Sequence, residues 1–438
     1  MEDGRPYFTT EVVWLEEDEP IVSAGSIQLM LRAPDEADLW ISSILGAAQK
    51  AKLLMQEPFP ERIVRYLVGI VELLNDYDRN CCHLFRVIRR PPLVKGEKGS
   101  SDDLSKSGPS VSYLVVGVNY IHMIQLPDFT TSGRPLITKS KNRPHGIVTL
   151  VSMEMTESDD RFSLEFRLPL ERPNKILLAS SATSDIAFYI FRAHQYLKPN
   201  WIQYSFAWAG PRRFKELAEA PVDRAKEDLG GFNTTITAYC QGYGCDISNI
   251  QYTLNWDVED APEFKLLPPA RNAKYSTKEL LAIMRTLRYN EFFRSISFEG
   301  VDLHSLHGTS DSFGTEHVAM STYDGAPIYS VLEVKTWERS LLYQEVQAIA
   351  LKSRSLVRMN FGNTLPRRRV RNTSDWGGML ADKDPGCEFI AAILPLCRKT
   401  ITTVSWIILS GIELGDTDFE DLGMQLAIPH QLLLLIYC

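Results

Sequence analysis

The hydrophobic positions of this 438-residue chain follow two different periods, and the change falls near residue 275. At the N-terminus, two short β-prone runs (residues 11–15 and 26–31) precede a helix that opens at Pro34-Asp35-Glu36, because proline and acidic residues suit a first helical turn. Its apolar face contains Ala37, Trp40, Ile41, Ile44 and Ala48. Two short strands do not form a stable sheet alone, so residues 1–58 are predicted to be the closing end of a β-domain that lacks its opening strands.

A second amphipathic helix, with Ile63, Leu67, Ile70 and Leu74 on one side, is predicted to be a connector over residues 59–79. Six short runs rich in Val, Ile, Leu and aromatic residues follow, and turn residues bound each of them. They span residues 83–88, 112–118, 120–126, 146–153, 162–168 and 175–179. One helix capped by Ser184 comes next, with Ile186, Ile190, Ala193 and Leu197 on one stripe. Residues 80–199 are therefore predicted to form an α+β barrel or sandwich with one helix.

Residues 200–275 have a less regular pattern. They contain clusters of Pro, Gly and aromatic residues, a helix-compatible stretch at residues 234–240 and an acidic run at residues 257–260. We interpret this segment as a packed connector module between two domains.

After Tyr275 the hydrophobic period becomes helical. Ser276 and Glu279 have the spacing of a capping box, in which the serine accepts the Glu279 amide and the glutamate reaches back to the serine amide. A helix is predicted there, followed by a strand at residues 293–298. Two further helices precede strands at residues 356–361 and 404–409, and Asp384-Pro385 is expected to open the third helix. Residues 276–438 thus contain an internal repeat of helix followed by strand.

The strand runs share apolar residues at relative positions 1, 4, 6, 9 and 11. The runs that start at Phe293 and Val404 match fully, and the run at Leu356 matches the first half. This spacing is typical of a leucine-rich repeat (LRR), because a strand followed by an inward-turning arc points alternate side chains into a stacked core. The starts lie 63 and 48 residues apart, whereas such repeats span about 20–29 residues, so insertions or further units are expected between them.

Residues 31–53 and 80–199 resemble pleckstrin-homology (PH) domains, in which one C-terminal helix, often with a Trp where Trp40 stands, closes a curved antiparallel sheet. With the repeat region, the order resembles a family of large fungal PH and LRR proteins with ribonuclease-inhibitor-like repeats. The resemblance is carried by Asn290-Glu-Phe-Phe-Arg-Ser-Ile-Ser-Phe, Gln344-Glu-Val-Gln-Ala-Ile-Ala-Leu, Asp384-Pro-Gly-Cys-Glu and Val404-Ser-Trp-Ile-Ile-Leu-Ser-Gly-Ile-Glu-Leu. It implies an α+β multidomain protein in which PH-like β-barrel domains precede an α/β LRR solenoid (residues 276–438), a scaffold or adaptor role, and no catalytic motif.

The sequence stops inside the next repeat unit. Residues 416–426 are predicted to be a helix and residues 431–436 a strand with no successor. Because a solenoid normally ends with a polar cap, we expect this sequence to be part of a longer protein.

Composition and charge exclude several classes of protein. With 44% hydrophobic and 23% charged residues the composition is that of a globular protein, and the net charge of −8 argues against a nucleic-acid binder. No stretch approaches the ~18–20 apolar residues of a membrane-spanning helix, and the N-terminus lacks an apolar signal region. Seven scattered cysteines fit reduced thiols. We therefore expect a cytoplasmic protein, with the cell cortex as the candidate location.

No catalytic signature is present: the motifs GxGxxG, GxxxxGK[ST], GxSxG and HExxH are all missing, and no motif pairs a nucleophile with a base. One segment has the composition of a zinc site and consists of His304, His307, Asp311, Glu316 and His317. Its Gly, Ser and Thr content favours a solvated loop instead. Cys240 and Cys245 lack a metal-binding spacing and are interpreted as buried thiols. We predict no metal, no cofactor and no small-molecule substrate.

Two basic loops are predicted in the second PH-like domain, at the end where many PH domains bind phosphoinositide head groups. The cations are Arg89, Arg90, Lys95 and Lys98 in the first loop and Arg134, Lys139, Lys141 and Arg143 in the second. The first loop also holds Glu97, Asp102 and Asp103, so weak attraction to an anionic membrane and a plain solvated surface both stay open. The run of residues 367–371, Arg-Arg-Arg-Val-Arg, fits a charged insertion loop better than a nuclear localisation signal.

Three functions remain. The first is a non-enzymatic scaffold or adaptor whose LRR surface binds a protein partner and whose PH-like domain provides docking. The second is a peripheral phosphoinositide-binding membrane adaptor. The third and most remote is a metal-dependent hydrolase built on His304, His307 and His317.

Overall fold

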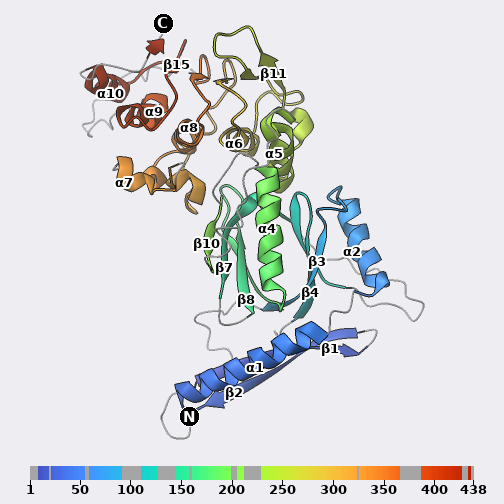
Figure 1. Ribbon diagram of the computed structural model, residues 1–438. Helices are drawn as coiled ribbons and strands as arrows, with labels where there is room; N and C mark the ends of the chain where they lie inside the picture. The colour runs from blue at the N-terminus through green and yellow to red at the C-terminus, as the bar shows by residue number, and fades with distance from the viewer. Residues whose placement is uncertain are drawn as a thin grey trace, which may run out of the picture. The chain divides into compact units, whose positions relative to one another are not determined.

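The structure is a computed structural model, and Figure 1 shows the order of its elements. It describes residues 8–18, 21–54, 59–90, 110–126, 144–156, 160–198, 205–211, 228–322, 325–332, 334–365, 386–426 and 433–435. The chain forms two compact units. The first comprises Met1–Phe166, Asn174–Ala193 and Trp208–Leu217, and the second comprises Arg167–Pro173, His194–Ala207 and Ala218–Cys438. No helix of the described ranges is long and apolar enough to span a bilayer.

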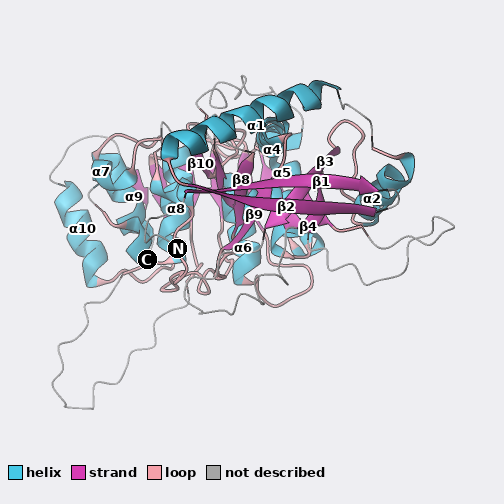
Figure 2. Cartoon of the chain, turned by 90° about the horizontal axis from the view of Figure 1, so that it is seen from below, coloured by secondary structure: helices cyan, strands magenta, loops and turns pink. Residues whose placement is uncertain are grey.

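The first unit begins with a long hairpin and a helix. Strands β1 (Phe8–Asp18) and β2 (Ile21–Leu31) pair antiparallel along their whole length, and α1 (Pro34–Leu54) lies along them in both views (Figures 1 and 2). The helix opens at Pro34 as predicted, and both strands are longer than predicted. Several large apolar side chains stay exposed: Phe8, Trp14, Ile27, Met30, Leu39 and Trp40. One hairpin and one helix supply too few surfaces to cover them.

The rest of the first unit is built around an eight-stranded sheet of order β10-β7-β8-β9-β3-β4-β5-β6. Its strands are β3 (His83–Arg90), β4 (Ser110–Val116), β5 (Tyr120–Ile124), β6 (His145–Gly146), β7 (Leu150–Met155), β8 (Arg161–Phe166), β9 (Asn174–Ala179) and β10 (Ala207–Ala209). The helix α4 (Thr183–Leu197) follows β9 and buries Ile186, Ile190 and Leu197 of the predicted stripe. All pairs for which the register is known are antiparallel, including β3 with β9.

Among the described residues, seven strands precede α4 in this sheet, whereas the sequence pattern predicted six. The difference lies at the predicted strand over residues 146–153. There a 3₁₀ turn at Ile147–Thr149 separates β6 from β7. All three turn residues are buried, so the hydrophobic pattern is not interrupted there and predicts one continuous strand.

The helix α2 (Glu61–Leu73), predicted as a connector, packs on this sheet. Its Ile63, Leu67 and Val71 share one buried cluster with residues of β4 and β5, namely Tyr113, Val115 and Ile124. The buried Asp76 carboxylate anchors the chain just after α2. It accepts a hydrogen bond from the Asn119 amide at 2.6 Å and lies 2.8 Å from His122 Nε2.

The second unit repeats helix and strand. Its elements are α5 (Asp228–Tyr243), β11 (Tyr252–Asn255), β12 (Glu263–Leu266), α6 (Thr277–Leu287), β13 (Ser295–Ser297), α7 (Ile328–Leu332), α8 (Leu341–Lys352), β14 (Arg358–Asn360), α9 (Phe389–Arg398), β15 (Trp406–Ile408), α10 (Asp416–Leu426) and β16 (Leu433–Leu435). The strands form one sheet in chain order, parallel from β12 to β16, with β11 antiparallel at its edge. Residues 228–266, interpreted above as connector, therefore contribute a helix and the first two strands.

The core of the second unit runs along the stacked strands. The middle residues Ile296, Met359 and Ile407 are buried, and the rings of Phe298, Phe361 and Phe389 stack with centroids 5.8 and 4.2 Å apart. The predicted capping box of Ser276 and Glu279 opens α6. The third helix differs from its prediction: α9 begins at Phe389 after Glu388, whose φ is 68°, and Asp384-Pro385 lies outside the described residues.

Candidate functional site: a strand face and a buried ionic cluster

One face of the parallel sheet carries polar side chains beside the buried middle residues. Successive residues of a strand point to opposite faces, so the flanking residues of each strand share the second face, and the pairing puts Ser295, Arg358 and Trp406 in one row. We call this surface the strand face and define it by Glu263, Ser295, Arg358, Asn360, Trp406 and Ile408. Near β12 and β13 it is closed, because the buried Glu263 carboxylate accepts hydrogen bonds from Asn255 at 3.1 Å and Ser295 at 3.2 Å.

Towards β14 and β15 the strand face opens. Arg358, Asn360, Trp406 and Ile408 are half-buried there. The Arg358 guanidinium lies over the Trp406 ring, 5.3 Å from its centroid, and its Nε is 3.9 Å from the Asp260 carboxylate. Neither Arg358 Nε nor Asp260 Oδ2 has a hydrogen-bond partner among the described residues. An arginine and a tryptophan held together at a partly open surface are the residue types that dominate binding energy in protein interfaces.

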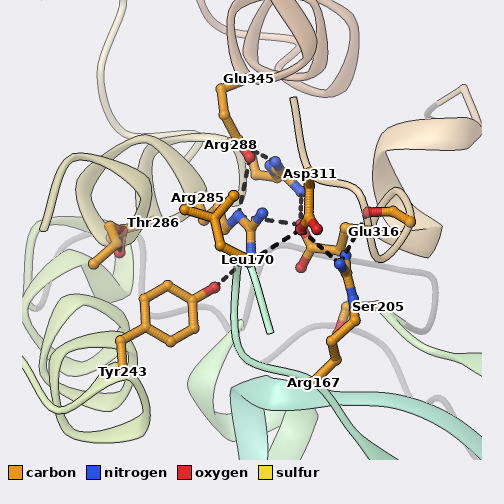
Figure 3. A network of polar contacts seen from close by, with 12 residues as sticks. Arg167, Leu170, Ser205, Tyr243, Arg285, Thr286, Arg288, Asp311, Glu316 and Glu345 are labelled. Atoms are coloured by element: carbon orange, nitrogen blue, oxygen red, sulfur yellow. Dashed lines mark hydrogen bonds and ion pairs between the residues drawn. The ribbon is translucent and has the colours of Figure 1, made fainter. Parts of the chain in front are cut away.

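A second polar constellation is a buried ionic cluster around α6 (Figure 3). Arg288 Nη1 lies 2.7 Å from Glu316, and its Nη2 pairs with Glu345 of α8. Arg285 donates to Glu345 at 3.0 Å and to the Tyr243 hydroxyl at 2.6 Å. Burial alone would raise the pKa of Glu316, but Arg285 and Arg288 lower it to about 2, so this carboxylate is ionised. The two arginines thus connect the α6 region both to Glu316 and to Glu345 of α8.

Two buried lysines extend the cluster. Lys198 donates to Ser205 Oγ at 2.8 Å and lies 4.4 Å from the centroid of the Tyr289 ring. Lys352, at the end of α8, donates to Ser321 Oγ at 2.9 Å and to the Thr322 carbonyl at 3.1 Å. Burial lowers the pKa of each lysine to about 7, because removing an ammonium group from water disfavours its charged form.

Ser205 also lies 3.0 Å from His194 Nδ1, so the fold pairs a hydroxyl with two bases that no sequence motif connects. The exposed fractions of Lys198, Ser205 and His194 are 2%, 5% and 5%. A reacting serine must be reached by its substrate, and this one is enclosed by the core. The contact is therefore a structural hydrogen-bond chain.

The predicted histidine-rich segment is not a solvated loop at its carboxylates. Asp311 accepts from Arg167 Nη1 at 2.6 Å and from the Leu170 amide at 3.2 Å (Figure 3), and Glu316 pairs with Arg288. His304 and His307 stack with centroids 6.2 Å apart, and the His317 side chain lies outside the described residues. In the part of the chain that the structure describes, no three His, Cys, Asp or Glu residues are grouped to hold a metal ion.

The predicted lipid-binding residues are mostly outside the described ranges, namely Lys95, Lys98, Arg134, Lys139, Lys141 and Arg143. Arg89 and Arg90 were expected in the first loop, but both belong to β3, because β3 continues to pair with Leu178 and Leu177 of β9. The sheet fixes where the two loops attach. β3, β4, β5 and β6 are successively antiparallel, so the β3–β4 and β5–β6 connections leave the same end of the sheet.

The two cysteines interpreted as buried thiols differ in exposure: Cys240 is buried and Cys245 half-buried, and both are free. Burial raises the pKa of the Cys240 thiol to about 12, which keeps it protonated at neutral pH.

Comparison with known proteins supports part of this architecture. Residues 62–224 match the family described as the second PH domain in LRR-containing protein. The match starts inside α2, in agreement with the packing of that helix on the sheet. It supports a PH-containing protein of the PH and LRR class.

No curated protein matches the chain. A solved structure, the complex of PDZ-RhoGEF DH/PH domains with GTP-γ-S-activated RhoA, is similar at 13% identity with a TM-score of 0.18. The similarity covers 25% of this chain and 28% of that chain. A similarity of this size establishes neither a common overall fold nor a common partner.

Proposed function

We propose that the protein is a non-enzymatic adaptor that binds a protein partner through the strand face of an LRR-type second unit and docks through its PH-like domain. One observation carries the proposal: four parallel strands, each preceded by a helix, present Arg358 and Trp406 on a partly open surface. Stacked repeats of this kind form extended binding surfaces. The family match over residues 62–224 supports the combination with a PH domain.

Affinity capture with the full chain tests this proposal. Partners retained by the wild type should be lost from Trp406→Ala and Arg358→Ala. They should be retained by Phe419→Ala, a matched control that removes an exposed aromatic ring from α10. Retention of the same partners by all three variants would contradict binding through the strand face.

A second candidate function is a peripheral phosphoinositide-binding adaptor. The observation in its favour is that the β3–β4 and β5–β6 connections, in which the sequence has six of the predicted cations, leave the same end of the sheet. Each cation near an anionic leaflet contributes on the order of 1 kcal/mol, and salt screens the attraction. Vesicles that contain a phosphoinositide should sediment the wild-type chain, and Lys139→Glu with Lys141→Glu should abolish this. Binding that survives both charge reversals would refute the site.

A further inference from the structure

The arginine of the strand face has hydrogen-bonding groups that the fold does not use. Its guanidinium lies over the Trp406 ring, and its closest approach to a carboxylate is the 3.9 Å between Nε and Asp260. Charge-assisted hydrogen bonds span about 2.7–2.9 Å, so this ion pair is not closed by a hydrogen bond. Nε is the enclosed nitrogen, and no atom of the described residues accepts from Nη1 or Nη2 of Arg358. The two Nη atoms therefore form a free pair of donors at a half-buried position.

The neighbouring side chains add further donors. Arg358 pairs with Trp406 and Asn360 with Ile408, so these residues occupy two rows that are about 7 Å apart. Asn360 Oδ1 already accepts the Gly362 amide at 2.9 Å, so the part of this side chain that is left over is its NH₂ group. The indole N–H of Trp406 can only donate, and none of the described residues accepts from it. The complement of this open surface is a group that carries acceptors.

The geometry of the guanidinium selects among acceptors. Its two Nη groups donate in parallel and match the two oxygens of a carboxylate, whereas a single carbonyl oxygen occupies one of them. Trp406 supports the plane of this fork. The Asp260 carboxylate, 3.9 Å from Nε, limits how much negative charge a ligand can bring. A phosphate monoester carries about twice the charge of a carboxylate at neutral pH, so Asp260 repels it more strongly.

We propose that the strand face binds an acidic segment of a protein partner, in which one Asp or Glu carboxylate accepts hydrogen bonds from both Nη atoms of Arg358. An aliphatic residue beside this acidic residue packs on Ile408, which is half-buried in the adjacent row. Backbone carbonyls of the same segment accept from Asn360 and Trp406. The inference rests on the proposed function, because it gives the chemistry of the partner at the same site.

The probe is a random library of displayed twelve-residue peptides, selected on the immobilised full chain. Peptides that bind the wild type are passed over Arg358→Ala, and those that this variant fails to retain are kept. We expect the kept peptides to share an Asp or Glu next to an aliphatic residue. In fluorescence anisotropy, Gln or Asn in place of that acidic residue should weaken binding of a kept peptide at least tenfold. Phosphoserine in its place should weaken binding at least threefold.

Variants of the chain separate direct contact from a structural role. Arg358→Lys keeps the charge but loses the paired N–H groups, and should weaken binding of a kept peptide at least tenfold. Asp260→Asn removes the opposing charge and should tighten binding at least twofold, which loss of a structural contact would not do. Arg271→Ala is the matched control, because it removes an exposed arginine of the same unit, and should change binding less than twofold. Circular dichroism shows whether each variant is folded, and Arg358→Gln replaces Arg358→Ala if that variant is not.

Absence of peptides that depend on Arg358 overturns the proposal, as do kept peptides without a common acidic residue. Tighter binding of the phosphoserine peptide than of the acidic peptide also overturns it. These failures are distinct from failure of the proposed function. Capture of partners that are lost from both Trp406→Ala and Arg358→Ala would still support binding through the strand face, with a partner of another chemistry.

Discussion

The N-terminal element formed by β1, β2 and α1 differs from the α6 region of the second unit in the side chains that it buries. In the first, Trp40 and Leu39 are 47% and 67% exposed although both are apolar. In the second, Arg288 is fully buried although it is charged. The first element has one hairpin and one helix, whereas α6 has α5 on one side and α8 on the other. The number of packed neighbours therefore decides burial here, and polarity decides which interactions a buried side chain must then make.

Among the variants considered, the largest loss of unfolding free energy is expected at Arg288. Arg288→Met leaves Glu316 and Glu345 with one arginine fewer, and an uncompensated buried carboxylate costs about 3–5 kcal/mol. Chemical denaturation of the full chain measures this loss of unfolding free energy. Arg271→Met is the control, because its ion pair with Asp246 is exposed and should be worth less than about 1 kcal/mol. Equal losses would show that the cluster does not stabilise the unit.

The buried lysines of the second unit should make its stability depend on pH. Lys198 and Lys352 have pKa values of about 7 in the fold against 10.5 when unfolded, so above pH 7 the unfolded state binds more protons. The unfolding free energy should rise from pH 7 to about 8.5, by at most about 1.4 kcal/mol per pH unit for each lysine. Above pH 9 the buried thiols, whose pKa values the fold raises, oppose this rise.

Denaturation curves measured at several pH values test the rise. Lys198→Met with Lys352→Met should flatten it, because those two groups no longer titrate. A slope that persists in the double variant would assign the effect to other groups.

A smaller effect is expected at the start of α6. Ser276→Ala removes a hydroxyl that accepts the Glu279 amide, and loss of such a cap costs about 1 kcal/mol. Thermal denaturation should show a corresponding decrease in midpoint. Ser42→Ala, at an exposed position inside α1, serves as the control and should have almost no effect. A decrease of the same size in both variants would argue against a specific role for the cap.

The smallest effect is expected in the hairpin element. Leu39→Ser changes a side chain that is 67% exposed, so the unfolding free energy should change by less than about 0.5 kcal/mol. A loss above 1 kcal/mol would mean that a neighbour covers this face in solution, and the comparison with α6 would then disappear. Analytical ultracentrifugation would identify a second copy as that neighbour if the wild type sediments as a dimer and Leu39→Ser as a monomer.

Features set by local chemistry were predictable from the sequence. The capping box of Ser276 and Glu279, the start of α1 at Pro34 and the strand positions near residues 296, 359 and 407 depend on neighbours within a few residues. The PH-type sheet was also recognisable, apart from the break at residues 147–149. The structure has a 3₁₀ turn there, but the hydrophobic run contains no residue that signals a turn.

The buried ionic cluster was not predictable in the same way. Arg285 lies opposite the apolar stripe of α6, and Arg288 directly follows the last residue of the helix, so both have the pattern of solvated positions. They are buried because neighbours cover both sides of the helix, and a single helix pattern does not record a second neighbour. Their partners Glu316 and Glu345 are 28 and 57 residues beyond Arg288. The three-residue spacing of two arginines on a helix inside a repeat was the available signal.

The Asp76 carboxylate that anchors α2 also restricts which substitutions the sequence tolerates nearby. The Asp76 carboxylate occupies the space beside Gly117, where an added Cβ would lie 2.0 Å from Asp76 Oδ2. A larger residue at position 117 is therefore acceptable only after the aspartate has shortened or moved, and such a change would deprive His122 of its buried partner. Substitutions at positions 76, 117 and 122 are therefore expected to be coupled. Among descendants of a common ancestor these residues should be replaced together or remain together.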